Sequence, residues 1–396
     1  MVKGSGSPLF ANSGCKPYLV RTSRKRTEGL RPSARATLPD GRMMRSLSAN
    51  VSVATPAALE PAEIGGQSGW TQSFTNDGPV DVSVCIANWN CRNHLRACLT
   101  SLQDYPQGAC IETIVVDNAS TDGALEMIAK EFPEVILVRN ADNAGFARAS
   151  NQAAALAKGR FVFFLNNDTI VPPNALGKLM AFAEQHPEVG MVGPLLRDGL
   201  GRMQISYRRM PSMWAMLHRA ALLRWTGLFK LAYGVYRRQT FKPVDVQRVE
   251  VLMGAAILMR RQIFEACGRW DEDFRFGVED VELSARVGRN YALVFHPGVE
   301  IIHHGRLSSR QNVCFSAPNH LIGYVHYFRK TGYSWLAVLS YKLLVTIDTP
   351  IQLAGRVVQY VVRRIRGKSE KAGKSMLAVR GYWHFLTRSL YRFWKA

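Results

Sequence analysis

Short apolar runs alternate with segments of helical periodicity through the middle of the chain. Four apolar runs of strand length lie at 80–87, 111–117, 134–140 and 160–165. The segments 94–102 and 144–157 space their apolar residues as a helix does. Continuous apolar strands that alternate with helices indicate a mainly parallel sheet with helices on both faces. The pattern therefore predicts an α/β domain.

Amides and carboxylates stand at the carboxyl ends of these runs. Asn88 and Asn90 follow the first run, Asp117 ends the second, and Asp168 follows the fourth. A single Asp at a strand end indicates no more than a turn, because it bonds to its own backbone. In parallel sheets, however, ligands bind outside the carboxyl ends of the strands. Three polar clusters at one edge therefore favour a binding site.

This edge lacks the usual phosphate-binding loops. The sequence has no G-x-G-x-x-G after the first strand and no G-x-x-x-x-G-K-[ST], which disfavours dinucleotide enzymes and P-loop NTPases. A phosphate bound here needs another counter-charge. Mg²⁺ typically takes one or two carboxylates together with the phosphates of the substrate, and Asp168 could supply one of them.

Further along, an acidic turn leads into a helix and then into a histidine pair. "GVEDVELSARV" (277–287) places Glu279 and Asp280 at the start of a helix, where acids also favour the macrodipole. "YALVFHPGVEIIHHGRLS" (291–308) reads as strand, turn and strand, with His303 and His304 near its end. Histidine and carboxylate together suit Mn²⁺ or Mg²⁺.

The order of these motifs resembles a known family. The motifs are "VSVCIANWN", "IVVDNASTDG", "NAGFARASN", "FLNNDT", "GAAILMRRQIF", "GRWDEDF", "EDVEL" and "HHGRLS". In this order and spacing they resemble the inverting family-two glycosyltransferases of the GT-A fold, in particular the bacterial rhamnosyltransferase-like branch. The resemblance covers about residues 80–310 and implies the fold of a nucleotide-diphospho-sugar transferase.

The resemblance implies a nucleotide-sugar pocket and a metal site. The pocket residues it implies are Asn88, Asn90, Asp117, Asn143, Asn167 and Asp168. Asp117 corresponds to the contact to the nucleotide base. Asp168 corresponds to the last acid of the D-x-D-type motif that binds Mg²⁺ or Mn²⁺, and His303 completes the metal shell ahead of His304.

Catalytic and acceptor roles are implied by the same resemblance. Asp280 corresponds to the general base, with Glu279 as its neighbour. Trp270, Asp271 and Glu272 lie where the family shapes the acceptor side. A positioned carboxylate can remove the proton of the acceptor hydroxyl as it attacks the sugar.

Two positions depart from the family pattern. Asn166 stands where the first acid of D-x-D is expected, which weakens the predicted metal site. Asn88-Trp89-Asn90 replaces the Thr-Tyr-Asn that often ends the first strand, which leaves the preference for a nucleotide base open.

The net charge of +21 is concentrated at the two ends of the chain. Residues 1–75 carry 10 Lys/Arg against 4 Asp/Glu, residues 76–304 carry 25 against 24, and residues 305–396 carry 16 against 2. Basic tails fit nucleic acid or an anionic membrane. A balanced core without a recognition motif argues against a nucleic-acid-binding protein, so we expect no nucleic acid partner.

The charge and the motifs together predict three regions. Residues 1–75 form a disordered basic segment, residues 76–310 the GT-A domain, and residues 311–396 a basic, amphipathic helical region. Within the domain, 199–244 holds 9 Lys/Arg and no acid among many aromatic and aliphatic residues. Such a segment fits either a pair of core helices or a surface on the acceptor and membrane side.

The C-terminal region suggests attachment to a membrane surface. Lys342, Asp348, Pro350 and Arg356 interrupt every apolar stretch of the roughly 20 residues that a spanning helix needs. The segment 351–365 has an apolar face and a basic polar face, typical of a helix lying on an anionic bilayer. The seven cysteines form no C-x-x-C pair, and no signal-peptide h-region is visible. These features predict a cytoplasmic enzyme on the inner face of the cell membrane.

The predicted function is inverting transfer of a sugar, with rhamnose suggested by the branch, from a nucleotide-diphosphate donor to a glycan or lipid-linked acceptor in cell-surface polysaccharide synthesis. The alternatives are a nucleotidyltransferase of similar fold and a basic nucleic-acid-binding protein. A nucleotidyltransferase would release pyrophosphate and would not need a base placed like Asp280. A glycosidase would have no use for a metal-bound diphosphate.

Overall fold

The computed structural model describes residues 79–237, 244–305 and 312–396. The segment 1–75, which the sequence predicts to be disordered, lies outside the described residues.

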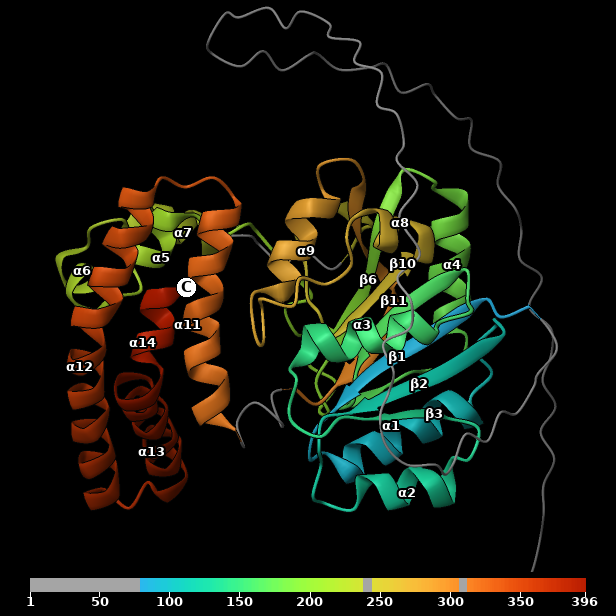
Figure 1. The fold of residues 1–396 in the computed structure, drawn as a ribbon, viewed down its shortest axis with the longest axis horizontal. Coiled ribbons are helices and arrows are strands. Elements are labelled where there is room, and N and C mark those ends of the chain that lie inside the picture. Colours follow the sequence, from blue (N-terminus) through green and yellow to red (C-terminus); the bar gives the residue numbers. More distant parts are fainter. Residues whose placement is uncertain (1–78, 238–243, 306–311) are drawn as a thin grey trace, which may run out of the picture. The chain divides into compact units, whose positions relative to one another are not determined.

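A nine-stranded sheet forms the centre of the fold (Figure 1), with strand order β3-β2-β1-β4-β10-β6-β11-β5 and β8 paired to β11. Its strands are β1 Val82–Asn88, β2 Ile111–Asp117, β3 Ile136–Arg139, β4 Phe161–Asn166, β5 Thr169–Ile170, β6 Val189–Arg197, β8 Gln247–Arg248, β10 Ala256–Arg260 and β11 Ala292–His303. Strands β1 to β4 pair in parallel, whereas β10 runs antiparallel to β4. A separate two-stranded sheet pairs β7 Tyr207–Arg208 with β9 Val251–Leu252. The predicted, mainly parallel α/β sheet is confirmed.

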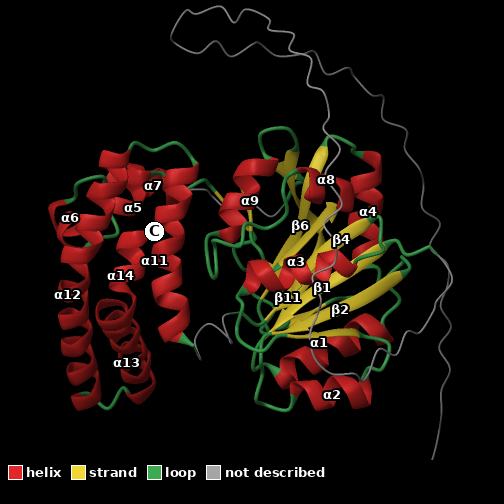
Figure 2. Cartoon of the chain, viewed as in Figure 1, coloured by secondary structure: helices red, strands yellow, loops and turns green. Residues whose placement is uncertain are grey.

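Helices pack on both faces of the sheet, as Figure 2 shows. They are α1 Arg92–Asp104, α2 Ala124–Glu131, α3 Phe146–Leu156, α4 Ala175–Gln185, α8 Arg261–Ala266 and α9 Glu279–Val287. Alternate side chains of β4 enter two different cores. Phe161, Phe163 and Leu165 pack with α1, α2 and α4, while Val162 and Phe164 pack with α3, α8 and α9. Both faces of this strand are buried, which explains its unbroken apolar sequence.

Strand register brings the polar strand ends to one level. Asn88 at the end of β1 is paired with Asp117 at the end of β2, and Ala87 is paired with Asn166 at the end of β4. The site residues therefore project from the rigid, fully buried centre of the sheet.

Strand β11 differs from its prediction. The sequence suggests strand, turn and strand, but the structure has one strand with a shift of register between His296 and Glu300. Pro297 and Gly298 lie inside this irregularity. A bulge accommodates both residues, because Pro cannot donate to the ladder and Gly tolerates the local bend.

The remaining helices come from two distant parts of the chain: α5 Met213–Leu217, α6 Ala221–Thr226, α7 Lys230–Arg237, α11 Val313–Lys330, α12 Trp335–Ile365, α13 Ser369–His384 and, after a π-helical turn at Phe385–Ser389, α14 Leu390–Lys395. One apolar cluster joins Met213 of α5 and Val281 of α9 to Phe328 of α11 and Tyr341 of α12. The cluster crosses the predicted boundary at 310, so the division into 76–310 and 311–396 stays a prediction.

Helix α12 continues through Pro350, although the sequence suggests separate segments on either side of it. Pro350 has no N–H to donate to the preceding turn. Nearby hydroxyl groups bond to carbonyls of this turn: Thr346 donates to the Lys342 carbonyl at 2.8 Å and Thr349 to the Val345 carbonyl at 2.6 Å.

Candidate active site

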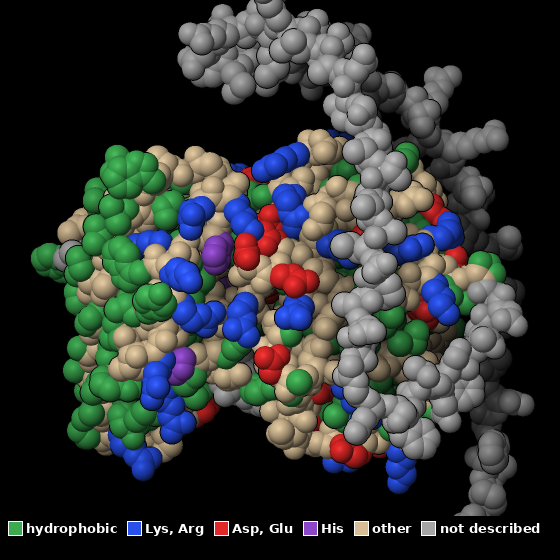
Figure 3. All heavy atoms as spheres, viewed as in Figure 1, with side chains coloured by type: hydrophobic (Ala, Val, Ile, Leu, Met, Phe, Trp, Pro, Cys, Tyr) green, Lys and Arg blue, Asp and Glu red, His purple; other side chains and the backbone are tan. Residues whose placement is uncertain are grey.

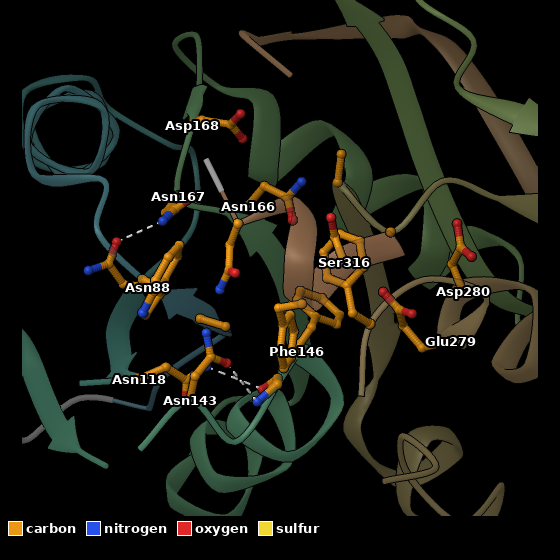
Figure 4. A pocket seen from close by; sticks show the side chains of 18 of the residues that line it. Asn88, Asn118, Asn143, Phe146, Asn166, Asn167, Asp168, Glu279, Asp280 and Ser316 are labelled. Atoms are coloured by element: carbon orange, nitrogen blue, oxygen red, sulfur yellow. Dashed lines mark hydrogen bonds between the residues drawn. The ribbon is translucent and has the colours of Figure 1, made fainter. Parts of the chain in front are cut away.

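A cavity of about 270 Å³ opens at the carboxyl edge of β1 and β4 (Figure 4). Of the twelve residues that the sequence predicts for the site, seven line this cavity: Asn88, Asn143, Asn167, Asp168, Glu279, Asp280 and His303. None of the described residues that line it is Lys or Arg. Three of them are acids, so a diphosphate bound here needs a cation that the cavity wall itself does not supply.

Hydrogen bonds between side chains connect the carboxyl ends of β4, β1 and β2. Asn167 donates to Asn88 Oδ1 at 2.7 Å, and Asn88 Nδ2 donates to Asp117 Oδ2 at 2.7 Å. The second oxygen of Asp117 accepts from the Ser120 N–H at 2.8 Å. Asp117 is fully buried and does not line the cavity. In this structure it therefore orients Asn88, and its contact to a nucleotide base stays a prediction.

Asn90 also stabilises the loops at this edge. Its side-chain oxygen accepts from the Thr121 N–H at 2.7 Å, and its own N–H donates to Ser120 Oγ at 2.9 Å. Asn90 has a positive φ of 45°, which Asn tolerates better than most residues. It ties the loop after β1 to the loop after β2 and does not line the cavity.

A glycine turn forms the wall near Asn143. The Gly145 N–H donates to Asn143 Oδ1 at 3.1 Å, and its carbonyl accepts from Asn118 Nδ2 at 3.3 Å. Gly145 has φ +91°, and a Cβ atom there would collide with the Arg275 carbonyl. Only glycine fits this position, which explains the glycine directly before α3.

Asp168 and His303 meet across the cavity edge. Pairing of β11 with β5 sets His303 beside Thr169, and His303 Nε2 lies 3.3 Å from Asp168 Oδ1. Burial acts to raise the pKa of Asp168, but His303 and backbone N–H groups outweigh burial and hold this pKa below its usual value. The carboxylate is therefore ionised at neutral pH.

Gln204 fixes the orientation of the His303 ring. Its Nε2 donates to the His303 carbonyl at 2.7 Å, which turns its Oε1 toward His303 Nδ1 at 2.9 Å. Because Oε1 can only accept, Nδ1 carries a proton. In the neutral imidazole, Nε2 then presents a lone pair toward the Asp168 carboxylate. Asn166 Nδ2 lies 3.2 Å from His303 Nε2 and donates to this lone pair in the neutral tautomer. A metal ion bound between Nε2 and the Asp168 carboxylate would take the place of this hydrogen bond.

This donor set fits Mg²⁺ or Mn²⁺. An oriented imidazole nitrogen and an ionised carboxylate are suitable ligands, and the hydrogen bond from Gln204 is the kind of support that metal-binding histidines have. Among the described residues there is no cluster of three or more His, Cys, Asp or Glu side chains that could hold a metal. Asp168 and His303 would therefore share the ion with the phosphates of a ligand, as Mg²⁺ commonly requires.

The acids of α9 have contrasting environments. Arg208 Nη2 contacts both oxygens of Asp280, at 2.8 and 2.9 Å. Glu279 Oε2 has no hydrogen-bond partner in the described part of the chain. Burial, reinforced by the charge of Asp280, raises the pKa of Glu279 to about 8. At neutral pH most Glu279 is therefore protonated, whereas Asp280 forms an ion pair with Arg208.

Arg208 and Gln204 are missing from the sequence-based prediction. Both come from the acid-free segment 199–244, which the sequence identifies only as a basic surface of the acceptor and membrane side. No motif marks either residue. The signal that could have led to Arg208 is the lack of any acid near it in sequence, which left this basic residue free to pair with Asp280.

The cavity has two functional sides. Figure 4 shows Asp168 on one side and Glu279 with Asp280 on the other, with Phe146 between them. Phe276 and Phe315 also line the cavity. One side can hold a diphosphate with its cation, and the other offers a carboxylate for proton removal.

The predicted acceptor residues do not line this cavity. Trp270 is buried, with its ring centroid 5.3 Å from that of Phe146. Asp271 forms an ion pair with Lys330, and Glu272 accepts from Asn151 Nδ2 at 3.0 Å. Each has a structural partner here, and a role on the acceptor side stays a prediction.

Comparison with known sequences finds similarity to glycosyltransferases. Residues 83–268 match the family model for glycosyl transferase family 2. An N-acetylglucosaminyl-diphospho-decaprenol L-rhamnosyltransferase of Mycobacterium tuberculosis is 28% identical over 252 residues, covering 59% of this chain and 80% of the relative. The O-antigen biosynthesis protein RfbC of Myxococcus xanthus is 27% identical over 242 residues, covering 59% of this chain and 18% of the relative.

Solved glycosyltransferase structures overlap with the chain more loosely. The mannosyltransferase PcManGT from Pyrobaculum calidifontis, in complex with GDP-Man and Mn²⁺, has a TM-score of 0.46 at 18% identity, covering 82% of this chain and 91% of that one. GalNAc-T7 with UDP, GalNAc and Mn²⁺ has a TM-score of 0.45 at 19% identity, covering 63% and 48%. The family match spans β1 to β10 and ends before Glu279, Asp280 and His303. Together with the curated relatives it supports the assignment of the chain as a family-two glycosyltransferase, similar to rhamnosyltransferases.

Proposed function

We propose that this enzyme transfers a sugar, with inversion, from a nucleotide-diphosphate donor to a hydroxyl of a lipid-linked glycan acceptor in cell-surface polysaccharide synthesis. The main support is the arrangement of the cavity, with Asp168 and His303 on one side and Asp280 on the other. The printed name of the mycobacterial relative supports a lipid diphosphate acceptor and rhamnose as the sugar.

In this proposal, different residues bind the donor and remove the proton of the acceptor. Asp168 and His303 hold the diphosphate end of the donor together with Mg²⁺ or Mn²⁺, and the bound ion would neutralise charge on the leaving diphosphate. Asp280 accepts the proton of the acceptor hydroxyl, which then attacks the sugar from the face opposite the diphosphate. Arg208 orients the Asp280 carboxylate.

A panel of nucleotide sugars tests the proposal. Purified enzyme should release nucleoside diphosphate from one sugar class, and the release should increase when a lipid-linked acceptor is added. NMR of the product should show the inverted anomer. Release of pyrophosphate would instead identify a nucleotidyltransferase, and retention of the anomeric configuration would exclude Asp280 as the base of an inverting reaction.

We also propose that the enzyme binds the inner face of the membrane peripherally, through α12 and neighbouring helices. The sequence-based expectation that charges and a proline rule out every window of spanning length is wrong for α12: among the described residues, α12 is the one helix long and apolar enough to cross a membrane. Only 28% of its apolar stretch is buried, which leaves an apolar surface for contact with lipid. Its exposed apolar residues include Trp335, Leu343, Ile347, Ile351, Val358 and Ile365. Trp225 of α6 and Leu231 of α7 are more than four-fifths exposed, and Figure 3 shows apolar side chains gathered along one edge. Exposed patches of this size mark interaction surfaces.

Binding to vesicles that contain phosphatidylglycerol is the expected result of this arrangement. Arg363, Arg364 and Arg366 at the end of α12 each contribute roughly 1 kcal/mol near an anionic surface. The double variant Ile347→Glu/Ile351→Glu should lose most of the sedimentation with vesicles. Leu156→Glu, at an exposed apolar position of α3, should sediment like the wild type. High salt should release the wild type, and resistance to both salt and carbonate extraction would contradict peripheral binding.

A further inference from the structure

A second cavity, also of about 270 Å³, lies among α5, α6, α7, α11, α12 and α13. Three arginines line it: Arg219, Arg224 and Arg356. In the described ranges none of the three forms an ion pair with a carboxylate. Arg219 lies 3.7 Å from Met216 Sδ, and Arg356 donates to Gln359 Oε1 at 3.0 Å. The cavity therefore holds three guanidinium groups that have no carboxylate as an ion-pair partner among the described residues.

The one acid among the lining residues is Asp348, and both its oxygens already accept hydrogen bonds. Oδ1 accepts from the Ala221 N–H at 2.6 Å, and Oδ2 accepts from Gln352 Nε2 at 2.5 Å. Asp348 is buried and caps the start of α6. The cavity keeps a net positive charge, which favours an anionic ligand.

Two tyrosines connect this cavity with the active site. The Arg219 guanidinium lies over the Tyr324 ring, 5.8 Å from its centroid. Tyr324 hydrogen bonds to Tyr236 and interacts electrostatically with Arg208, which holds Asp280. Two side chains, Tyr324 and Arg208, thus connect Arg219 of the second cavity with the predicted base.

The surroundings of the cavity suggest an amphiphilic ligand. Gln352 and Arg356 of α12 line the cavity, while Ile347, Ile351 and Val358 of the same helix are exposed apolar residues. A ligand with a charged head in the cavity could lay an apolar tail along α12. Three guanidinium groups suit more than one phosphate, because each presents a planar fork of donors.

We propose that the second cavity binds the diphosphate of the lipid-linked acceptor, with Arg219, Arg224 and Arg356 contacting the phosphates and the lipid chain following α12. The proposal rests on the proposed function, since it deepens the identity of the acceptor. It assigns the donor diphosphate to the cavity with Asp168 and the acceptor diphosphate to this one.

Calorimetry on the full-length enzyme, without turnover, tests the assignment with farnesyl diphosphate as the probe. Arg224→Gln and Arg356→Gln should each weaken binding about tenfold or more, because a hydrogen bond to a charged group contributes about 1.5–3 kcal/mol. Arg148→Gln is the matched control, since Arg148 is an exposed arginine of α3 that lines neither cavity. Arg219→Lys keeps the positive charge but loses the paired N–H donors of the planar guanidinium. It should therefore weaken binding less than Arg219→Gln. Thermal melting confirms that each variant is folded.

Three results would overturn the assignment. One is unchanged farnesyl diphosphate affinity in folded Arg224→Gln and Arg356→Gln. Another is loss of binding in Asp168→Ala alone, which would place the probe in the donor site. The third is that the arginine variants weaken binding of farnesol or of phosphatidylglycerol vesicles as much as they weaken binding of farnesyl diphosphate. This result would mean that the arginines contact lipid in general and do not recognise the diphosphate. If the enzyme uses only a soluble acceptor, the proposed function fails in the turnover assay, while calorimetry still reports independently on this cavity.

Discussion

Asp280→Asn is expected to lower sugar transfer by about two to four orders of magnitude, the usual contribution of a general acid or base. The change removes the proton acceptor but keeps the shape of the side chain. Asp280 lies across the cavity from Asp168, so the affinity for nucleoside diphosphate should stay the same. Initial rates with saturating donor and acceptor measure the loss, and calorimetry measures nucleotide binding.

Glu279→Gln is the matched control, because Glu279 precedes Asp280 at the start of the same helix. Its pKa is raised to about 8 by burial and by the charge of Asp280, so it is mostly protonated at pH 7 and cannot serve as an efficient base there. Gln mimics the protonated form, and transfer at pH 7 should fall by no more than a few-fold. Full activity of Asp280→Asn together with an inactive Glu279→Gln would move the base to Glu279.

The strands of the first half of the domain are predictable because their sequence pattern is undisturbed. β4 is a continuous apolar run, and β1 beside it and β2 on the far side of β1 end on Asn88 and Asp117 in the observed register. Strand β6 is not evident from the sequence, because Gly190, Gly193 and Pro194 interrupt Val189–Arg197. Gly190 and Gly193 are required by packing, since a Cβ atom would come within 2.7 Å of Tyr291 or Leu252. A local pattern cannot reveal such tertiary contacts.

The site residues divide in the same way. Asp168 and His303 can be proposed from sequence because each follows a strand and belongs to a motif. Gln204 and Arg208 cannot, because their partners lie 99 and 72 positions away. Their own segment 199–244 has no periodicity that would place it over the cavity. The sequence thus indicates the reacting groups, whereas the residues that orient them emerge only from the folded chain.

Removal of the divalent ion is expected to abolish tight binding of the donor. The cavity is lined by three acids and by no described Lys or Arg, so without the ion the donor diphosphate would have no cationic lining residue beside it. Asp168→Ala should therefore weaken nucleoside diphosphate binding in Mn²⁺ as strongly as EDTA does in the wild type. Gln204→Ala should lower Mn²⁺ affinity by about 10- to 100-fold, the effect usual for a residue that orients a metal-binding His.

The variant His304→Ala tests whether His303 rather than the adjacent His304 is the metal ligand. The His304 ring packs against His94, with the ring centroids 5.0 Å apart, and its side chain does not line the cavity. It should keep Mn²⁺-dependent binding, whereas His303→Ala should lose most of it. Turnover that persists undiminished in EDTA would contradict the metal site. The counter-charge of the diphosphate would then have to come from a basic side chain that moves into the cavity when the donor binds, and Asp168→Ala would bind nucleotide more tightly than the wild type.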